Sequence, residues 1–334
     1  MTSTEDTAKP AKRGSGALAA LLGSALAAAA GGIVYSSLAV PHELPLPDAV
    51  SGERREIGGR AGRLSYYVAG AGEPLLLIHS INATASAYEM RPLFEHYKHS
   101  RRVYALDLPG FGFAERGDRE YTPRLYTDAV LAMVDEVARD SGVHSLDAVA
   151  LSLSSEFLAR AASEQPTRFR SLALISPTAF KSGDRFYQPT GSIRGVPWLA
   201  AAFKFPLWKQ ALFDGLNSRV SQRYYTEKTF GSKQVDEGLL AYQYPAAHQP
   251  GAAYAPLSFI SGMLFSADID RVYDQLELPV WLAHGVRGDF TDYGGIAKVR
   301  NRPNWSIQSF ETGAIPYFED VTGFVACLDA FLQH

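Results

Sequence analysis

The feature that most constrains the fold is a stretch from Leu146 to Ala162, in which a strand-like pattern changes into a helix-like pattern at one serine. The run Leu146 to Leu151 is almost wholly apolar, and after Ser152 the apolar residues recur at helical spacing. Small residues, Ala150 and Ser154, stand two positions before and two positions after Ser152. This is the pattern of a nucleophile elbow, in which a sharp turn exposes a serine and requires small neighbours. By itself the pattern also fits an ordinary strand, turn and helix.

Short apolar runs alternate with helix-length segments along most of the chain. Strands are predicted at residues 64–68, 75–79, 103–106, 146–151, 172–175, 279–284 and 305–310, and helices at residues 85–97, 122–140 and 320–332. Strands that are apolar throughout are typical of sheets covered on both faces. The alternation therefore predicts an α/β protein with a mostly parallel central sheet and helices on both faces.

The alternation stops after Pro177 and resumes about a hundred residues later. The intervening segment is rich in aromatic residues, Pro and Gly, and it shows helical fragments without a clear buried strand. We therefore predict a first core segment over residues 53–177, a mainly helical cap over residues 178–276 and a second core segment over residues 277–334. A Pro-rich linker over residues 41–52 precedes them.

The N-terminal region divides into a polar part and an apolar part. Residues 1–13 are polar and are predicted to be a disordered tail. Residues 14–40 carry no charge, but only eight of these 27 residues are Leu, Ile or Val. Three interpretations stay open: a membrane anchor, a cleaved signal sequence, and a helix that belongs to a soluble domain. The first two predict a membrane-anchored or exported protein, and the third allows a soluble cytoplasmic one.

Composition and charge narrow the range of partners. The net charge of -3 and the lack of a Lys/Arg-rich run argue against nucleic acid. The single cysteine, Cys327, excludes an intrachain disulfide and lies in an apolar stretch, which predicts a core position. No metal-ligand spacing and no dinucleotide-binding glycine pattern occurs, so no cofactor and no metal are expected. The sequence sets no oligomeric state.

Three motifs in chain order resemble the α/β-hydrolase superfamily, in the cap-bearing group of the AB hydrolase-1 type. They are Leu-Leu-Ile-His79-Ser80, then Asp107-Leu-Pro-Gly-Phe-Gly112, then the elbow at Ser152. The resemblance covers about residues 53–332. It implies the α/β-hydrolase fold, with the cap over the site, and hydrolysis of an ester or similar acyl bond of an apolar small molecule.

The resemblance also implies roles for residues around the elbow. Ser152 would be the nucleophile. The backbone N–H groups of Leu153 and Ile81 would form an oxyanion hole, in which the negative charge of a tetrahedral intermediate is stabilised. His79 would support the loop that carries Ile81.

The acid and the base are less well matched. Asp289 best fits the acid that orients the base, and Asp292 is a poorer alternative. The family's histidine follows the last strand in a Gly-His-x-x-x-x-Glu-like pattern. Here Gly313 and Glu319 fit that pattern, but Ala314 occupies the histidine position. A serine hydroxyl needs an adjacent general base near neutral pH, so the usual triad is incomplete.

Three explanations of the missing base stay open. The fold serves as a catalytically inactive binding protein. Alternatively, His248 in the cap supplies the base. In the third explanation, Ser152 or Ser154 reacts by a different mechanism with Tyr317, Asp289 or bound water.

Overall fold

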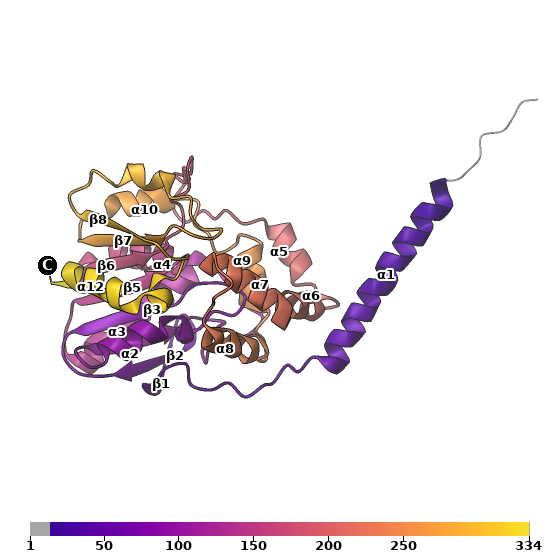
Figure 1. Ribbon diagram of the computed structural model, residues 1–334, viewed down its shortest axis with the longest axis horizontal. Coiled ribbons are helices and arrows are strands. Elements are labelled where there is room, and N and C mark those ends of the chain that lie inside the picture. The colour runs from indigo at the N-terminus through magenta and orange to yellow at the C-terminus, as the bar shows by residue number, and fades with distance from the viewer. Residues whose placement is uncertain (1–13, 334) are drawn as a thin grey trace, which may run out of the picture.

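The centre of the protein is an eight-stranded sheet in the strand order β1-β2-β4-β3-β5-β6-β7-β8 (Figure 1). The computed structural model describes residues 14–333, and the side chains of its first helix from Ala27 onward. Strands β3 to β8 are parallel, whereas β1 and β2 pair antiparallel. The strands are β1 (Glu53–Gly59), β2 (Gly62–Ala69), β3 (Pro74–Ile78), β4 (Arg102–Asp107), β5 (Leu146–Leu151), β6 (Phe169–Ile175), β7 (Val280–Gly285) and β8 (Trp305–Phe310). The predicted α/β fold is confirmed.

Helices cover both faces of the sheet and bury two separate apolar cores. Because successive side chains of a strand point to opposite faces, Leu75 and Leu77 of β3 enter one core, and Leu76 and Ile78 enter the other. The first core lies against α2 (Arg91–Tyr97), α11 (Pro316–Glu319) and α12 (Val321–Leu332), and the second against α3 (Pro123–Ser141), α4 (Ser154–Glu164) and α10 (Ile269–Gln275). Burial of each such leucine contributes about 1.5–3 kcal/mol, which explains the unbroken apolar run.

Two local predictions were wrong. The predicted helix over residues 85–97 is divided into a 3₁₀ turn, η1 (Ala87–Met90), and α2, whose second residue is proline. Proline suits the first turn of a helix because no N–H is needed there. Strand β1 was not predicted. Its sequence is charged and mostly exposed because it forms the edge of the sheet.

The segment between β6 and β7 contains six helices; the last, α10, packs on the core, and the first five form what we call the cap. They are α5 (Pro197–Phe203), α6 (Lys209–Leu216), α7 (Arg219–Phe230), α8 (Glu237–Ala247) and α9 (Tyr254–Ile260), and they gather at one end of the sheet (Figure 1). A Cβ atom on Gly110, in the loop after β4, would lie 2.4 Å from the Cβ of Ala255. A Cβ on Gly313, after β8, would lie 2.4 Å from the Cα of Phe230. The cap therefore lies on the loops at the carboxyl edge of the sheet.

The first helix, α1 (Gly14–Ala39), extends away from the body next to α6 (Figure 1). Its carboxyl end is attached to the cap by Asp214, which accepts a hydrogen bond of 2.6 Å from Ser36 and lies 2.9 Å from His42 Nε2. Among the described residues, no helix is long and apolar enough to cross a membrane, so the membrane-spanning segment predicted over residues 14–40 is not supported. The tail predicted over residues 1–13 lies outside the described residues.

Candidate active site

The turn between β5 and α4 holds Ser152 in a left-handed backbone conformation, with φ 56°. Such a conformation is uncommon for a residue other than glycine and costs on the order of 1 kcal/mol or more, so the surroundings must enforce it. The Ser152 N–H donates to the carbonyl of Ile175 at 2.8 Å, and the Ser152 carbonyl accepts from Ser155 N–H at 3.1 Å. The side chain of Ser152 is half-buried. The backbone therefore has the sharp turn that a nucleophile elbow requires.

The small neighbours of Ser152 are fully buried, which explains why they are small. Ala150 lies inside β5, and Ser154 begins α4. Ser154 has a hydroxyl where a glycine would have nothing, and this hydroxyl donates to the carbonyl of His79 at 2.5 Å. The elbow is thereby joined directly to the loop after β3. Because its hydroxyl is occupied and buried, Ser154 is a weaker nucleophile candidate than Ser152.

The loop after β3 is fixed by a buried carboxylate that sequence reasoning missed. Glu89, from η1, is 3% exposed and accepts from the Ser80 N–H at 2.8 Å and from Asn82 Nδ2 at 2.6 Å. Burial raises the pKa of Glu89. The only signal in the sequence was one acidic residue between apolar neighbours, Tyr88 and Met90.

His79 supports the same loop as a neutral imidazole. Its Nε2 accepts from the Leu108 N–H at 3.0 Å, and its Nδ1 lies 2.6 Å from the Ser80 carbonyl, which fixes the proton on Nδ1. Complete burial lowers the pKa of His79 to about 4. Asp107 continues the network, since it accepts from the N–H groups of Ala87 and Phe113, each at 2.9 Å. Burial raises the pKa of Asp107 to about 6.

The two amides expected in an oxyanion hole lie on neighbouring loops. Residues Ile78 and Ala150 are paired in register across β3 and β5, so the loops that carry Ile81 and Leu153 leave the sheet side by side. Within residues 14–333, neither of these two N–H groups donates a hydrogen bond to the protein. Two unpaired donors beside a serine are the arrangement that stabilises a developing oxyanion.

The position of the family's histidine is closed by backbone contacts. Ala314 is 7% exposed, its N–H donates to the Thr229 carbonyl at 2.8 Å, and its carbonyl accepts from Ser176 Oγ at 2.7 Å. The preceding Gly313 donates its N–H to Glu319 at 2.6 Å. Glu319 also pairs with Arg287. The glycine and the glutamate of the motif therefore hold the loop, while position 314 offers only a methyl group.

The acidic candidates both lie at the surface with other partners. The side chain of Asp289 is 54% exposed, and its Oδ1 lies 3.4 Å from Lys228 Nζ. Asp292 is also exposed, and it accepts from Ser182 Oγ at 2.5 Å and from the Gly294 N–H at 3.2 Å. Asp292 thus organises the turn before η3 (Gly294–Lys298). No hydrogen bond of the described residues directs either carboxylate toward Ser152.

The proposed base, His248, is buried at the end of α8 and faces the linker. Its Nδ1 lies 2.6 Å from the Tyr244 carbonyl, its ring lies 4.0 Å from the Tyr244 ring, and its carbonyl accepts from Leu44 N–H at 3.0 Å. Burial lowers the pKa of His248. Its nearest charged groups include Asp214, in the junction with α1. No hydrogen bond between described residues joins it to Ser152.

Tyr317, considered as an alternative partner, is fully buried, and its hydroxyl lies 3.7 Å from Met90 Sδ. Burial raises the pKa of Tyr317 well above its usual value, so the phenol stays protonated. A protonated phenol cannot accept the serine proton. Tyr317 therefore packs against the core as other buried aromatics do.

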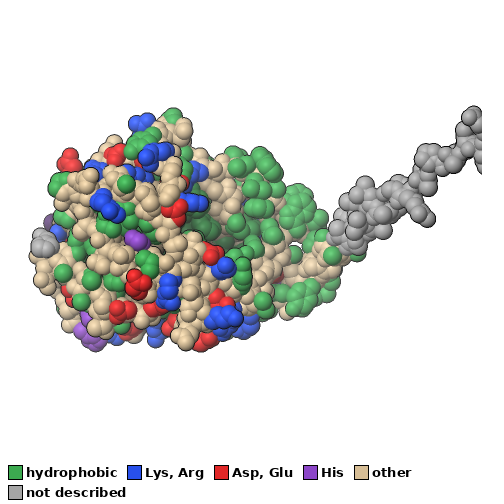
Figure 2. All heavy atoms as spheres, turned by 45° about the horizontal axis from the view of Figure 1, so that its top comes forward, with side chains coloured by type: hydrophobic (Ala, Val, Ile, Leu, Met, Phe, Trp, Pro, Cys, Tyr) green, Lys and Arg blue, Asp and Glu red, His purple; other side chains and the backbone are tan. Residues whose placement is uncertain are grey.

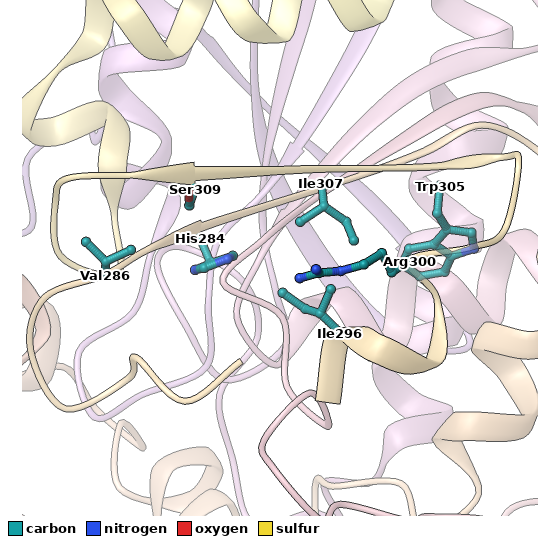
Figure 3. A pocket seen from close by; sticks show the side chains of 7 residues that line it. All are labelled: His284, Val286, Ile296, Arg300, Trp305, Ile307 and Ser309. Atoms are coloured by element: carbon teal, nitrogen blue, oxygen red, sulfur yellow. The ribbon is translucent and has the colours of Figure 1, made fainter. Parts of the chain in front are cut away.

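One cavity lies away from the elbow, between β7, β8 and η3 (Figure 3), and a smaller one is lined by residues of α7 and α8. The first cavity has a volume of about 610 Å³. His284, Arg300 and Ser309 point into it from different elements (Figure 3). His284 Nδ1 lies 2.9 Å from the Gly285 carbonyl, and its ring stacks on Tyr293 at 4.2 Å. Neither cavity is lined by Ser152.

The positive φ of Ser152 between a parallel strand and a helix is the backbone geometry that a nucleophile elbow requires. A sequence profile described as alpha/beta hydrolase fold matches residues 73–259, more than half of the chain. The protein belongs to this family. Within the described residues, no group of three His, Cys, Asp or Glu side chains is placed to hold a metal ion.

Similar proteins include hydrolases. A 2-hydroxymuconate semialdehyde hydrolase from Pseudomonas sp. (strain CF600) is 30% identical over 123 residues, which are 36% of this chain and 42% of that protein. The match therefore spans less than half of this curated relative.

Solved structures share the fold at low identity. A meta-cleavage product hydrolase from Pseudomonas fluorescens IP01 is 17% identical with a TM-score of 0.62, covering 84% of this chain and 97% of that one. A membrane phospholipase A is 18% identical with a TM-score of 0.63, covering 94% of this chain and 91% of that one.

Proposed function

We propose that the protein is a serine hydrolase that attacks an ester or similar acyl bond of an apolar small molecule and lacks the usual histidine base. One observation carries the proposal: Ser152 is held in a strained turn beside the unpaired N–H groups of Leu153 and Ile81. A fold that kept only a binding role would have no need to retain this strain. The hydrolase relative supports the same class of reaction.

The chemistry follows from these groups. Ser152 Oγ forms a bond to the acyl carbon, and the carbonyl electron pair moves to the oxygen, where the two N–H groups stabilise it. The proton of Ser152 passes to a base, and the tetrahedral intermediate then collapses with loss of the alkoxide, which takes up that proton and leaves as the alcohol. Attack of water on the acyl carbon releases the carboxylic acid and restores the Ser152 hydroxyl. A general base contributes about 10²–10⁴-fold to such a step. With Ala314 in place of histidine, we expect slow acylation in which water or hydroxide accepts the proton.

A second candidate function is binding without turnover. The pairing of Asp289 with Lys228 at the surface favours it, because no acid then orients a base. His248 is the one cap histidine through which turnover could be retained. The contacts of His248 with Tyr244 and with Leu44 of the linker argue against its role as the base.

A fluorophosphonate probe separates these functions, because it reacts with a serine that can attack a tetrahedral centre. We expect an adduct at Ser152, located by mass spectrometry, that is lost in Ser152→Ala. His248→Gln serves to test the cap histidine: a rate more than about tenfold lower would assign His248 as the base. Absence of an adduct at every pH tested would favour the binding protein and refute the hydrolase.

A further inference from the structure

Exposed apolar side chains gather at the end of the protein where α1 leaves the body. Among the side chains that the structure describes, twelve of the sixteen large hydrophobic residues that are exposed lie on α1 or between residues 196 and 260. In Figure 2, hydrophobic side chains gather on the part of the surface formed by the cap and the described end of α1. A soluble surface seldom exposes so many large apolar residues together, so this region is expected to contact something.

The centre of this region is the sequence from Val196 to Trp208, which contains α5 and the approach to α6. We call the exposed side chains here, together with those at the end of α1, the apolar cap face; they are Val34, Tyr35, Leu38, Val196, Trp198, Phe205, Leu207 and Trp208. Trp198 is 72% exposed, Leu207 is 62% exposed, and Leu38 is 83% exposed. Burying three such side chains from water would contribute several kcal/mol in any complex.

The two parts of the apolar cap face are held together. Asp214, 8% exposed on α6, accepts from Ser36 on α1 at 2.6 Å and lies 2.9 Å from His42 Nε2 just beyond it. Phe205 and Trp208 pack ring against ring at 4.6 Å. The end of α1 and the α5–α6 segment can therefore meet one surface at the same time.

The polar groups of the apolar cap face are compatible with binding to an apolar surface that carries negative charges at its edge. Trp208 Nε1 donates to the Ala202 carbonyl at 2.9 Å, so its ring can enter an apolar phase without losing a hydrogen bond. No Asp or Glu occurs between Arg185 and Phe213, whereas Lys204 and Lys209 flank the aromatic residues. Among the described residues the two ammonium groups lie over aromatic rings, Lys209 Nζ at 3.6 Å from the Tyr254 ring centroid and Lys204 Nζ at 6.0 Å from that of Tyr121.

We propose that the apolar cap face docks into the interfacial layer of a lipid bilayer that carries anionic headgroups. Tryptophan favours this layer because its ring is apolar and its N–H is polar. A lysine that leaves its aromatic ring to meet an anionic headgroup would gain about 1 kcal/mol, or roughly fivefold in binding. The uncharged sequence of residues 14–40 continues from the same face, which favours lipid over a folded partner.

Tryptophan fluorescence tests the proposal in the full chain. Of the four tryptophans, Trp198 and Trp208 belong to the apolar cap face, whereas Trp281 and Trp305 are 4% and 6% exposed. Vesicles of equal parts phosphatidylcholine and phosphatidylglycerol, with brominated acyl chains, should quench the first two. Replacing both by phenylalanine should remove most of the quenching, because the remaining two are buried in the core.

A matched pair of variants measures the binding strength. Trp198→Gln with Leu207→Gln should lower vesicle partitioning on the order of tenfold or more. The control, Phe290→Gln with Val321→Gln, removes two exposed apolar side chains elsewhere and should leave partitioning unchanged. Thermal melting of each variant verifies that it is folded.

Three results would overturn the proposal. Failure to bind these vesicles would exclude lipid. Co-sedimentation without quenching of Trp198 and Trp208 would show attachment through another segment. In the absence of lipid, acrylamide quenching of Trp198 and Trp208 could become weaker as the protein concentration rises. This result would assign the apolar cap face to contact with a second copy of the chain.

Discussion

The two halves of the candidate active site differ in how their polar groups are held. On the elbow side, Glu89, His79 and Ser154 form a continuous buried network around the loops after β3 and β5. On the side of β7 and β8, Ala314 has no polar side chain, and Asp289 pairs with a surface lysine. Under the proposed function, the elbow side would supply the groups for attack and oxyanion binding, whereas the described residues on the side of β7 and β8 offer no side chain directed to remove the proton.

The largest expected effect concerns the nucleophile itself. Ser152→Ala should lower fluorophosphonate labelling by at least about 10³-fold, because the other described serine with a positive φ, Ser176, has its hydroxyl bonded to the Ala314 carbonyl. The control is Ser154→Ala, which removes the neighbouring hydroxyl and should keep Ser152 reactive. Labelling is measured by mass spectrometry of the adduct peptide. An adduct that persists in Ser152→Ala and vanishes in Ser154→Ala would reverse the assignment.

The next largest effect is a pH dependence of the free energy of unfolding, which we expect from His79 on the elbow side of the site. Because His79 has a folded-state pKa of about 4 against an ordinary 6.5, the unfolded chain binds its proton first. The stabilising contribution of His79 is complete above pH 6.5 and is lost as the pH falls toward 4, by roughly 3 kcal/mol in total. Asp107 acts in the opposite sense, because with a folded-state pKa of about 6 the folded chain binds its proton before the unfolded chain does. Urea unfolding at neutral pH and near pH 4.5 is therefore compared between the unmodified chain and a variant that lacks the His79 titration.

His79→Gln is the variant that isolates this contribution. Glutamine can accept from the Leu108 N–H and donate to the Ser80 carbonyl, but it cannot titrate. We expect a shallower loss of unfolding free energy between pH 6.5 and 4 than in the unmodified protein. An unchanged slope would mean that other histidines carry the pH dependence.

A smaller effect is expected from the buried carboxylate. Glu89→Gln replaces one acceptor by a donor, so either the Ser80 N–H or the Asn82 amide loses its partner. This should lower the free energy of unfolding by about 1–3 kcal/mol and slow labelling of Ser152. Glu164→Gln at the surface serves as the control and should change stability by about 0.5 kcal/mol or less. Equal labelling rates in all three proteins would contradict the role given to Glu89.

The smallest effect is expected at Asp289. If this carboxylate only pairs with Lys228 in solvent, Asp289→Asn should change stability by less than about 1 kcal/mol and labelling by less than about twofold. Labelling kinetics measure both proteins in parallel. A loss of ten times or more would place Asp289 in the catalytic machinery after all.

The fold could be predicted from the sequence because each buried strand is marked by the residues of its own short segment. Runs such as Leu75 to Ile78 are apolar throughout, and only a strand buried on both faces explains that. Ser152 could also be predicted, because the change from strand to helix marks the turn. Strand β1 could not, since an edge strand carries charged residues and resembles a loop.

Most of the site depends on contacts between distant segments. Nothing near Glu89 in the sequence indicates that it accepts from Ser80 and Asn82, because the fold alone brings them together. The position of Asp289 relative to a strand likewise did not reveal its pairing with Lys228, which comes from the cap. That Ala314 occupies the histidine position stays a prediction from the sequence, which rests on Gly313 and Glu319 around it.

If the site lacks only a general base for Ser152, a histidine introduced by Ala314→His should supply it, and this variant is the most direct test. The rate of Ser152 labelling is followed against pH in this variant and in the unmodified chain. We predict that the unmodified rate rises steadily with hydroxide, and that the variant is faster on the order of 10² with an inflection near pH 6.5. A histidine-like inflection already present in the unmodified chain, or no labelling of a folded Ala314→His protein, would contradict the account.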